Sequence, residues 1–489
     1  MAILPDWKTM NRFALKSICC LAFVLGLLCS ALTERLADPS RAATLAKAYR
    51  FQRGGWIYVH LEGSPTEIGY QHGYLLAPEI ADLLAALKLF DTHHSQKGWA
   101  FFRNVARDQL WKHVDPEYQQ ELQAIAEGAR AHGLTLDVYD IVALNAWEEV
   151  PDYYLPWLDK RHHAARNLKL KAPGNCSAFI ATGTYTKDHG IVVAHNNWTS
   201  YLAGERWVMI FDIVPQRGQH ILMDGLPGII TSDDDFGINS AGIMITETTI
   251  TQFEGWDPKG KPEFMRSRKA LQYAQSIDDY VRIMKDGNNG GYANDWLIGD
   301  RKTGEIAYLE LGLKNTLLWR SHDGYFVSSN FPRDPKLIRE EASGFDPNNT
   351  SSSMNARRIR WEELIQQNKG KIDVELAQQF LADHVDSFDH KTQPNERTLC
   401  GHADASPRGI KEWEWDPFNP GGAVQGKVTD SEMTARMSFV ARAGHPCGED
   451  FIADKFLALH PEYSWQKPLL RDMKAGPWVE FSAGDKTHR

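Results

Sequence analysis

The sequence contains little cysteine and none of the short motifs that commonly hold metals or nucleotides. Six cysteines occur among 489 residues, and no pair has the CxxC spacing. HExxH and a Gly-rich phosphate loop are also missing. Asp233-Asp234-Asp235 is interpreted as a solvated turn rather than a calcium site, and His93-His94 and His162-His163 as surface residues. The sequence therefore predicts neither a cofactor nor a metal.

The sequence has fewer basic than acidic residues. Lysine and arginine number 54 against 63 acidic residues, giving a net charge of −9, whereas nucleic-acid binders carry basic patches. We therefore expect no nucleic-acid partner. The mean hydropathy of −0.43 excludes a polytopic membrane protein, while 43% hydrophobic residues suffice for a large core. The sequence leaves the oligomeric state open.

Only one long apolar run is present, Ser17–Ala31, and it follows Lys8, Arg12 and Lys16. This order is typical of a secretory signal peptide, predicted over residues 1–31. An uncleaved anchor helix is the alternative, but it needs about 20 apolar residues. We expect an exported protein, secreted or in a periplasmic or lysosome-like compartment, with no other membrane segment.

Removal of the signal leaves three cysteines, Cys176, Cys400 and Cys447. An odd number in an exported protein suggests one pair and one free thiol. Cys400 and Cys447 stand in Gly-containing, loop-like surroundings, so they are the predicted disulfide. Cys176 is then the free thiol.

The apolar spacing changes along the chain. The first part, from residue 49 to 172, is mostly helical after a strand at Trp56–Leu61, and Ser64 is predicted to cap a helix. Strands dominate after Cys176, without a βαβ rhythm. This predicts an α+β fold with antiparallel sheets. The expected helices are Pro78–Phe90, Pro116–His132, Leu136–Glu149, Ser267–Met284, Arg357–Gln367 and Val374–His384.

The most informative stretch is Gly174–Thr199, which reads as a β-hairpin with strands at Ser177–Thr182 and Ile191–Ala194. Cys176 opens the first strand, and His195 and Asn196 end the second, so an imidazole and an amide can lie beside the thiol. A buried core cysteine is the ordinary alternative. A papain-like Cys/His pair is disfavoured because both residues lie on one hairpin.

A cysteine in this position favours self-cleavage. The Cys176 thiol would attack the carbonyl carbon of Asn175, and hydrolysis of the resulting thioester would release a new α-amine. That amine has a reference pKa of about 7.7–8.0 and can act as the base for the same thiol. The basic segment Lys160–Lys171 just upstream is either a solvated loop or a site of trimming.

These residues resemble the cysteine Ntn-hydrolases. GNCSAF followed by AHNNW is similar to the penicillin acyltransferase family and the phospholipase B-like proteins, and more distantly to the bile-salt hydrolases. The similarity covers about residues 55 to 370. Its further segments, in the order of the family, are His60–Ile80, Gly237–Gly242, Asn294–Trp296, Asp300–Gly304, Glu310, Ser328–Phe331 and Asn355–Arg357.

The resemblance implies roles for individual residues. Cys176 matches the nucleophile, Asn330 the amide that faces the oxyanion, and Arg357 the arginine that orders the nucleophile's surroundings. From the residues alone, Asn330 can also be a turn-capping residue and Arg357 a surface helix residue.

Two positions depart from the acyltransferase and bile-salt hydrolase pattern. Thr199 stands where these enzymes have an aspartate, and Thr249 where the bile-salt hydrolases have a second oxyanion asparagine. Both changes move the chain towards the phospholipase B-like proteins, and His195 is then a candidate partner of the α-amine.

The resemblance also implies a four-layer αββα sandwich of two antiparallel sheets. The expected organisation is a signal peptide (1–31), a helical N-terminal chain (32–175) and a catalytic chain (176–489) that folds with residues 50–175 as one composite domain. The expected activity is hydrolysis of a linear amide of an N-acyl compound. The alternatives are an ester hydrolase or acyltransferase acting on lipids, and a non-catalytic binding protein with the same fold.

Overall fold

The computed structural model describes residues 39–161, 176–233 and 236–486. The chain divides into two units, residues 1–48 and 49–489. The described part of the first unit contains α2 (Pro39–Leu45). The predicted signal peptide and most of the basic segment lie outside the described residues. Among the helices that are described, none combines the length and the apolar character needed to cross a membrane.

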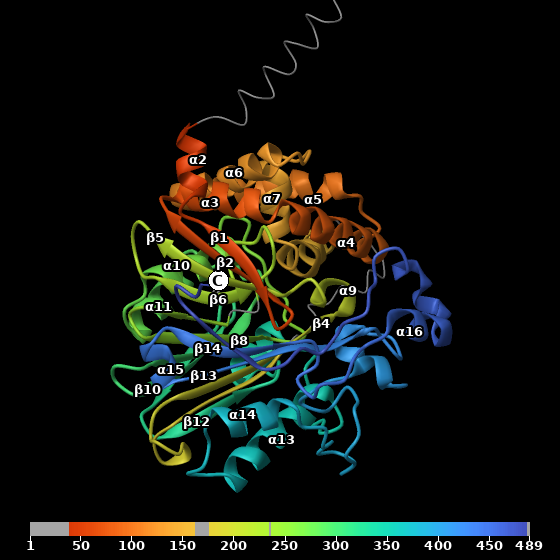
Figure 1. Cartoon of the computed structure of the whole chain (residues 1–489). Coiled ribbons are helices and arrows are strands. Elements are labelled where there is room, and N and C mark those ends of the chain that lie inside the picture. The colour runs from red at the N-terminus through yellow and green to blue at the C-terminus, as the bar shows by residue number, and fades with distance from the viewer. Residues whose placement is uncertain (1–38, 162–175, 234–235, 487–489) are drawn as a thin grey trace, which may run out of the picture. The chain divides into compact units, whose positions relative to one another are not determined.

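Two β-sheets form the centre of the unit 49–489 (Figure 1). The larger has nine strands in the order β1-β2-β5-β6-β7-β8-β9-β10-β11, and the smaller has six in the order β12-β3-β4-β13-β14-β15. Every neighbouring pair is antiparallel except β2 and β5, which are parallel. The nine strands are β1 (Tyr49–Arg53), β2 (Trp56–Gly63), β5 (Met209–Pro215), β6 (Ile221–Gly225), β7 (Gly237–Asn239), β8 (Ile243–Thr249), β9 (Asn294–Asp300), β10 (Glu305–Leu311) and β11 (Thr316–Ser321). The six are β3 (Ser177–Thr182), β4 (Val192–Ser200), β12 (Gly324–Ser328), β13 (Gly421–Asp430), β14 (Ser438–Ala443) and β15 (Val479–Ser482).

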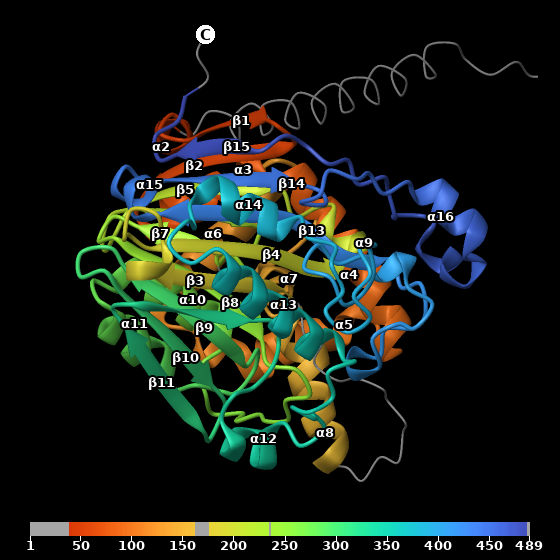
Figure 2. The same ribbon diagram turned by 90° about the horizontal axis from the view of Figure 1, so that it is seen from below.

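Helices cover the outer face of each sheet (Figures 1 and 2). On the nine-stranded sheet these include α3 (Pro65–Leu75), α4 (Ala77–Ser95), α5 (Trp99–Val105), α6 (Pro116–Ala131), α7 (Val138–Asn145), α10 (Glu263–Tyr273) and α11 (Ile277–Lys285). The six-stranded sheet carries α13 (Ser353–Gln367) and α14 (Val374–Leu381). The shorter helices are α8 (Leu155–Arg161), α9 (Tyr201–Gly204), α12 (Pro335–Glu341), α15 (Ser431–Ala435) and α16 (Ala453–Leu459). The unit is thus the predicted αββα sandwich.

The alternation of side chains along β3 separates two apolar cores. Ala178 and Ile180 pack between the two sheets with Leu297 and Tyr308. Phe179, the residue between them, packs on the other face among the side chains of α13 and α14. Because successive residues of a strand point to opposite faces, the position of a residue in β3 or β4 decides whether it faces the inter-sheet core or the helices.

Most predicted elements are present, with local differences. Ser64 forms a capping box with Glu67 at the start of α3. The single helix expected over Ser267–Met284 is two helices, because the chain leaves the helical conformation at Ala274 and Ser276 caps a new helix. The loop-like tail expected from Gly401 contains β13, which lies in the middle of the smaller sheet.

The predicted Cys400–Cys447 disulfide is not formed in this structure. Both residues are free thiols. The two sulfurs do lie in one cluster, as that prediction requires, but each is directed at Nε2 of His402, at 3.6 Å in both cases.

Candidate active site around Cys176

Cys176 directly precedes β3 and is only 1% exposed. Its φ of 93° is unfavourable for a residue with a side chain and indicates local backbone strain. The residues just before it, 162–175, lie outside the described part of the chain. A buried thiol on strained backbone therefore stands at the boundary where cleavage was predicted.

The thiol faces β4. Its Sγ lies 3.9 Å from Oδ1 of Asn197. A ring nitrogen of His195, a carboxylate oxygen of Glu247 on β8 and the Cys176 sulfur all lie within 4.8 Å of one another. An amide, an imidazole and a carboxylate thus surround one sulfur, between the two sheets.

Asn196 does not share this position. Its amide nitrogen donates to the backbone oxygens of Leu381 and Leu399, at 2.8 and 2.9 Å. Asn196 thus faces the helical layer, whereas Asn197 faces the thiol. The predicted hairpin is correct, but the amide beside Cys176 comes from the next residue. Thr199 is buried on β4 opposite Gly422.

Arg357, on the first turns of α13, links the nucleophile to Asn330. One guanidinium nitrogen donates to the backbone oxygen of Cys176 at 2.6 Å, and another to Oδ1 of Asn330 at 2.9 Å. The guanidinium also lies over the rings of Trp198 and Trp413, 4.4 and 5.4 Å from their centroids. Arg357 is therefore a buried residue of the site and not a surface helix residue.

The buried guanidinium provides positive charge beside the thiol. Burial lowers the pKa of Arg357 to about 9, and the nearby Cys176 acts in the opposite direction. Arg357 is thus a cation at neutral pH. A cation close to a thiol favours the thiolate, the reactive form of cysteine.

Asn330 and Thr249 meet at the end of β8. Nδ2 of Asn330 donates to the backbone oxygen of Thr249 at 2.9 Å, and Asn330 has a φ of 72°. The hydroxyl of Thr249 is buried and forms no hydrogen bond within the described residues. An amide and an unused hydroxyl group are therefore adjacent, connected to Cys176 through Arg357.

Acidic side chains gather around Tyr292, and sequence reasoning missed them; one of them, Glu247, also lies beside the thiol. The pKa of Tyr292 is raised well above its usual value by burial and by the charges of Glu148, Glu247, Cys176 and Asp233. Glu148 follows α7, so the N-terminal segment contributes a charge that acts on Tyr292. No motif surrounds Glu148, and its neighbour Glu149 instead binds backbone nitrogens of Glu263 and Phe264.

A pocket of about 150 Å³ is lined in part by residues 252–255, which follow β8 in the sequence. Its walls include Tyr153, Trp157 and Phe253, together with Gln252, which follows Thr249 by three residues. The backbone nitrogen of Thr251 also donates to the backbone oxygen of Asn330, at 3.2 Å. The segment after β8 thus connects the amide–hydroxyl pair to an aromatic pocket.

The fold and the site define an αββα sandwich with a buried cysteine at the head of an inner strand. The sequence model of the Phospholipase B family matches residues 86–319. That range contains Cys176, His195 and Thr249, while Asn330 and Arg357 lie beyond it. The match confirms the resemblance to the phospholipase B-like proteins.

Individual relatives agree with this result. The chain is 26% identical to putative phospholipase B-like 3 of Caenorhabditis elegans over 70% of this chain and 65% of the relative. It is 25% identical to an uncharacterized protein of Archaeoglobus fulgidus over 51% of this chain and 42% of the relative. It is 26% identical to the acyl-coenzyme A:6-aminopenicillanic-acid-acyltransferase 40 kDa form of Emericella nidulans over 47% of this chain and 57% of the relative. The chain thus spans less than two thirds of each of these three relatives.

Proposed function

We propose that the chain is an exported N-terminal-nucleophile hydrolase. It is made as a precursor, cleaves itself before Cys176, and hydrolyses a linear amide through an acyl-thioester on Cys176. The observation that carries the proposal is the bridge from Cys176 through Arg357 to Asn330, with hydrogen bonds of 2.6 and 2.9 Å. The bridge supports the proposal because it joins the residue that the resemblance assigns as nucleophile to a buried cation and to a side-chain amide.

Processing creates the catalytic base. The Cys176 thiol attacks the carbonyl carbon of Asn175, the peptide bond is replaced by a thioester, and water then cleaves the thioester. Residues 32–175 and 176–489 become separate chains of one domain. The released α-amine has a reference pKa of about 7.7–8.0, close to that of the thiol at about 8.5, so it can accept the thiol proton.

Turnover follows the same bond changes with an external substrate. The α-amine takes the thiol proton, the sulfur attacks the substrate carbonyl, and the resulting ammonium gives that proton to the leaving amine. Water, deprotonated by the α-amine, then hydrolyses the thioester and releases a carboxylic acid. The carboxylate of Glu247 stabilises the ammonium, since one of its oxygens lies within 4.8 Å of the Cys176 sulfur.

The oxyanion is stabilised by the Asn330 amide and the Thr249 hydroxyl. Both groups are buried, so their hydrogen bonds to a developing negative charge are stronger than in water. The hydroxyl of Thr249 has no partner in the described residues and is available for this role. Asn330 and Thr249 thus act as the two donors.

The substrate carries an acyl chain. Tyr153, Trp157 and Phe253 in the walls of the 150 Å³ pocket suit an apolar group, although Asp152, Lys160 and Glu254 also line it. The substrate class is therefore an N-acyl compound or an acylated lipid.

An ester hydrolase or acyltransferase is the second candidate. It is favoured by the names of the relatives, since one is called phospholipase B-like and another is named as an acyltransferase. The acyl-thioester is the same in each case. Only the leaving group and the final acceptor differ. A non-catalytic binding protein would form no such intermediate.

The test is direct detection of the acyl-thioester. Processed protein is mixed with a panel of N-acyl amides and lysophospholipids, and the reaction is quenched in acid. The protein is then digested, and the mass of the Cys176 peptide is measured by mass spectrometry. We expect the mass of one acyl group on this peptide and its removal by a neutral hydroxylamine wash, which cleaves thioesters but not oxygen esters. Product formation in processed wild-type protein without any acylated Cys176 peptide at short times would contradict the thioester mechanism. A processed protein that converts no member of the panel would favour the binding-protein alternative.

A further inference from the structure

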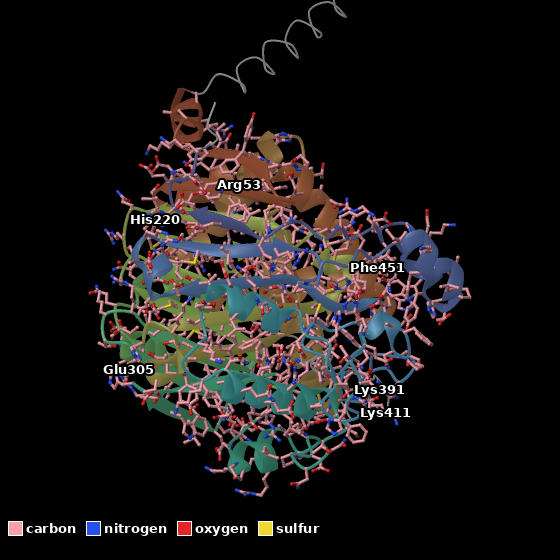
Figure 3. The ribbon with its side chains drawn as sticks, turned by 60° about the horizontal axis from the view of Figure 1, so that its bottom comes forward. Arg53, His220, Glu305, Lys391, Lys411 and Phe451 are labelled. Atoms are coloured by element: carbon pink, nitrogen blue, oxygen red, sulfur yellow. The ribbon has the colours of Figure 1, made fainter. Side chains whose placement is uncertain are left out.

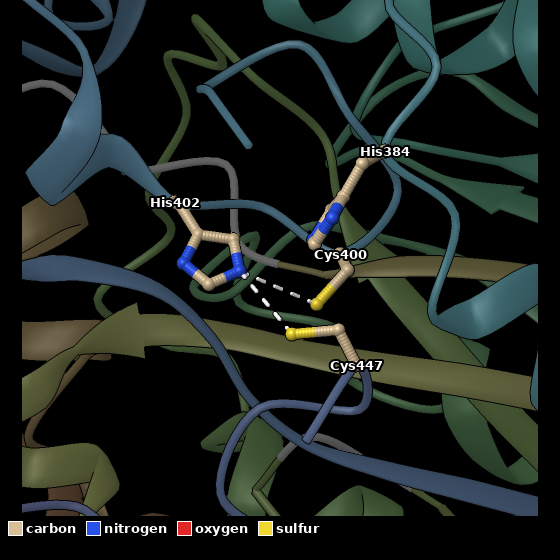
Figure 4. Close-up of side chains that lie close together, drawn as sticks. All are labelled: His384, Cys400, His402 and Cys447. Carbon is tan, nitrogen blue, oxygen red and sulfur yellow. Dashed lines mark hydrogen bonds between the residues drawn. The ribbon is translucent and has the colours of Figure 1, made fainter. Parts of the chain in front are cut away.

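A second cluster of cysteine and histidine lies away from Cys176, on the segment after α14 and the turn after β14. It consists of His384, Cys400, His402 and Cys447, and their ligand atoms all lie within 4.8 Å of one another (Figure 4). None of these residues belongs to the proposed catalytic machinery. We refer to them as the Cys₂His₂ cluster.

The spacing of the cluster agrees with a tetrahedral metal centre. Nε2 of His402 is 3.6 Å from the sulfur of Cys400 and 3.6 Å from that of Cys447. With Zn–S bonds of about 2.3 Å and Zn–N bonds of about 2.0–2.1 Å at tetrahedral angles, a sulfur and a nitrogen ligand are about 3.6 Å apart. The observed separations thus match those of ligands around one zinc ion.

Backbone hydrogen bonds hold the ligands in place without a metal. The nitrogen of Cys400 donates to Asp383 O at 3.1 Å, and that of His402 to Asn395 O at 3.1 Å. His402 also pairs with Gly422 of β13. The cluster is therefore fixed at several points of the backbone, as a preorganised site requires.

The histidines are directed into the cluster. Nδ1 of His402 lies 4.0 Å from the carboxylate of Asp404, and Asp404 accepts a hydrogen bond from Tyr201 at 2.7 Å. A carboxylate behind the outer ring nitrogen is the usual arrangement for a histidine that binds a metal through its other nitrogen. Nε2 of His384 is buried and forms no hydrogen bond within the described residues.

We propose that the Cys₂His₂ cluster binds one Zn²⁺ ion as a structural site. Two thiolates and two neutral imidazoles form a donor set that zinc prefers, and two thiolate charges balance those of the ion. The four protein ligands fill a tetrahedral shell and leave no position for a substrate or water, which distinguishes a structural from a catalytic zinc.

The zinc connects the peripheral segment to the strand that carries the catalytic hairpin. Leu399, next to Cys400, accepts hydrogen bonds from Asn196 at 2.9 Å and from the Trp198 indole at 3.3 Å. Both donors lie on β4, on the face opposite His195 and Asn197. The metal thus supports the back of the active-site strand.

An access route to the cluster exists. A pocket of about 280 Å³ is lined by His402, His445, Glu449 and Phe451, among others. Phe451, which lines this pocket, is labelled in Figure 3. A metal ion and a small chelator can therefore reach His402 from solvent.

A disulfide is the competing state of the two cysteines. Oxidation would join Cys400 and Cys447, and exported compartments permit it. A disulfide uses no histidine, however, and leaves His384 and His402 without a function. Zinc and a disulfide also exclude each other, because the same sulfurs are used.

The experiment measures metal in the full-length protein purified without added zinc or chelator. Elemental analysis is expected to give about one zinc per chain, and Co²⁺ exchange to give the visible bands of tetrahedral thiolate coordination. Cys447→Ser and His402→Gln should each lower zinc content at least about tenfold, since loss of one ligand opens the shell. His322→Gln, an exposed histidine (66%), is the matched control and should retain the metal.

Thiol mapping separates the outcomes. Under the proposal, peptides of Cys400 and Cys447 react with maleimide in denaturant only after a chelator is added, and the chelator lowers the unfolding temperature. A disulfide-linked peptide pair, with less than about a tenth of a zinc per chain, would overturn the proposal. These measurements use the unmodified protein, so they decide the question even if the variants fail to fold.

Discussion

The two cysteine centres of this molecule differ in what each sulfur faces. Cys176 faces the Asn197 amide at 3.9 Å, with the Arg357 guanidinium bound to its backbone oxygen. Cys400 and Cys447 face the same nitrogen of His402. One centre has a single thiol beside a cation, and the other has two thiols beside two imidazoles.

Under the two proposals, the surroundings determine the use of each thiol. A single sulfur near positive charge is activated as a nucleophile, because the charge favours the thiolate. Two sulfurs and two imidazole nitrogens at tetrahedral spacing instead share one metal ion. The two centres also differ in backbone conformation at their cysteines. Cys176 has a φ of 93°, whereas neither Cys400 nor Cys447 has a positive φ.

The largest effect on the catalytic side is expected at Asn330. Asn330→Ala should lower kcat by about 10²–10³, or about 2.7–4 kcal/mol, because one oxyanion donor is lost. Thr249→Val should have a smaller effect if the amide dominates. Thr246→Val is the matched control, since this hydroxyl on the same strand is also buried without a partner in the described residues. Steady-state kinetics on processed protein measure all three, and full activity of Asn330→Ala would remove the residue from the site.

Arg357→Met should have the next largest effect. The change keeps the apolar stem but removes the donors to the oxygens of Cys176 and Asn330, and each buried acceptor left unsatisfied costs about 1–3 kcal/mol. We expect a lower unfolding temperature together with slower processing. Arg339→Met, 67% exposed, should change neither. Thermal unfolding and gel analysis of processing report the outcome. Normal processing and stability in Arg357→Met would contradict the role that we give to this cation in the Cys176 centre.

Much of the candidate site could be predicted from sequence because its main residues lie in one hairpin and in short motifs. The alternation of β3 and β4 is visible in the residues, but the second strand was predicted to end at Ala194, whereas β4 continues to Ser200. Asn196 was named as the candidate amide, and the structure places Asn197 beside the thiol. Arg357 and Asn330 were found only through the family resemblance. Nothing local shows that a helix 181 residues after Cys176 reaches its carbonyl oxygen.

The Cys₂His₂ cluster escaped prediction for a physical reason. Its ligands are separated along the chain, with only Cys400 and His402 close in sequence, and no zinc-type spacing results. The segment Cys400-Gly401-His402 was the sequence signal that could have pointed to a metal site. Pairing cysteines by number alone predicted a disulfide, whereas the fold places two histidines against the same sulfurs. Tertiary proximity, which the sequence does not encode locally, accounts for this difference.

The central claim is that Cys176 becomes an N-terminal residue. N-terminal sequencing and intact mass of the purified protein test it directly. The account predicts a chain that begins at Cys176 and comprises residues 176–489, and an uncut precursor in Cys176→Ala. A wild-type chain that remains joined across residues 175 and 176, or the same cut in Cys176→Ala, would contradict it.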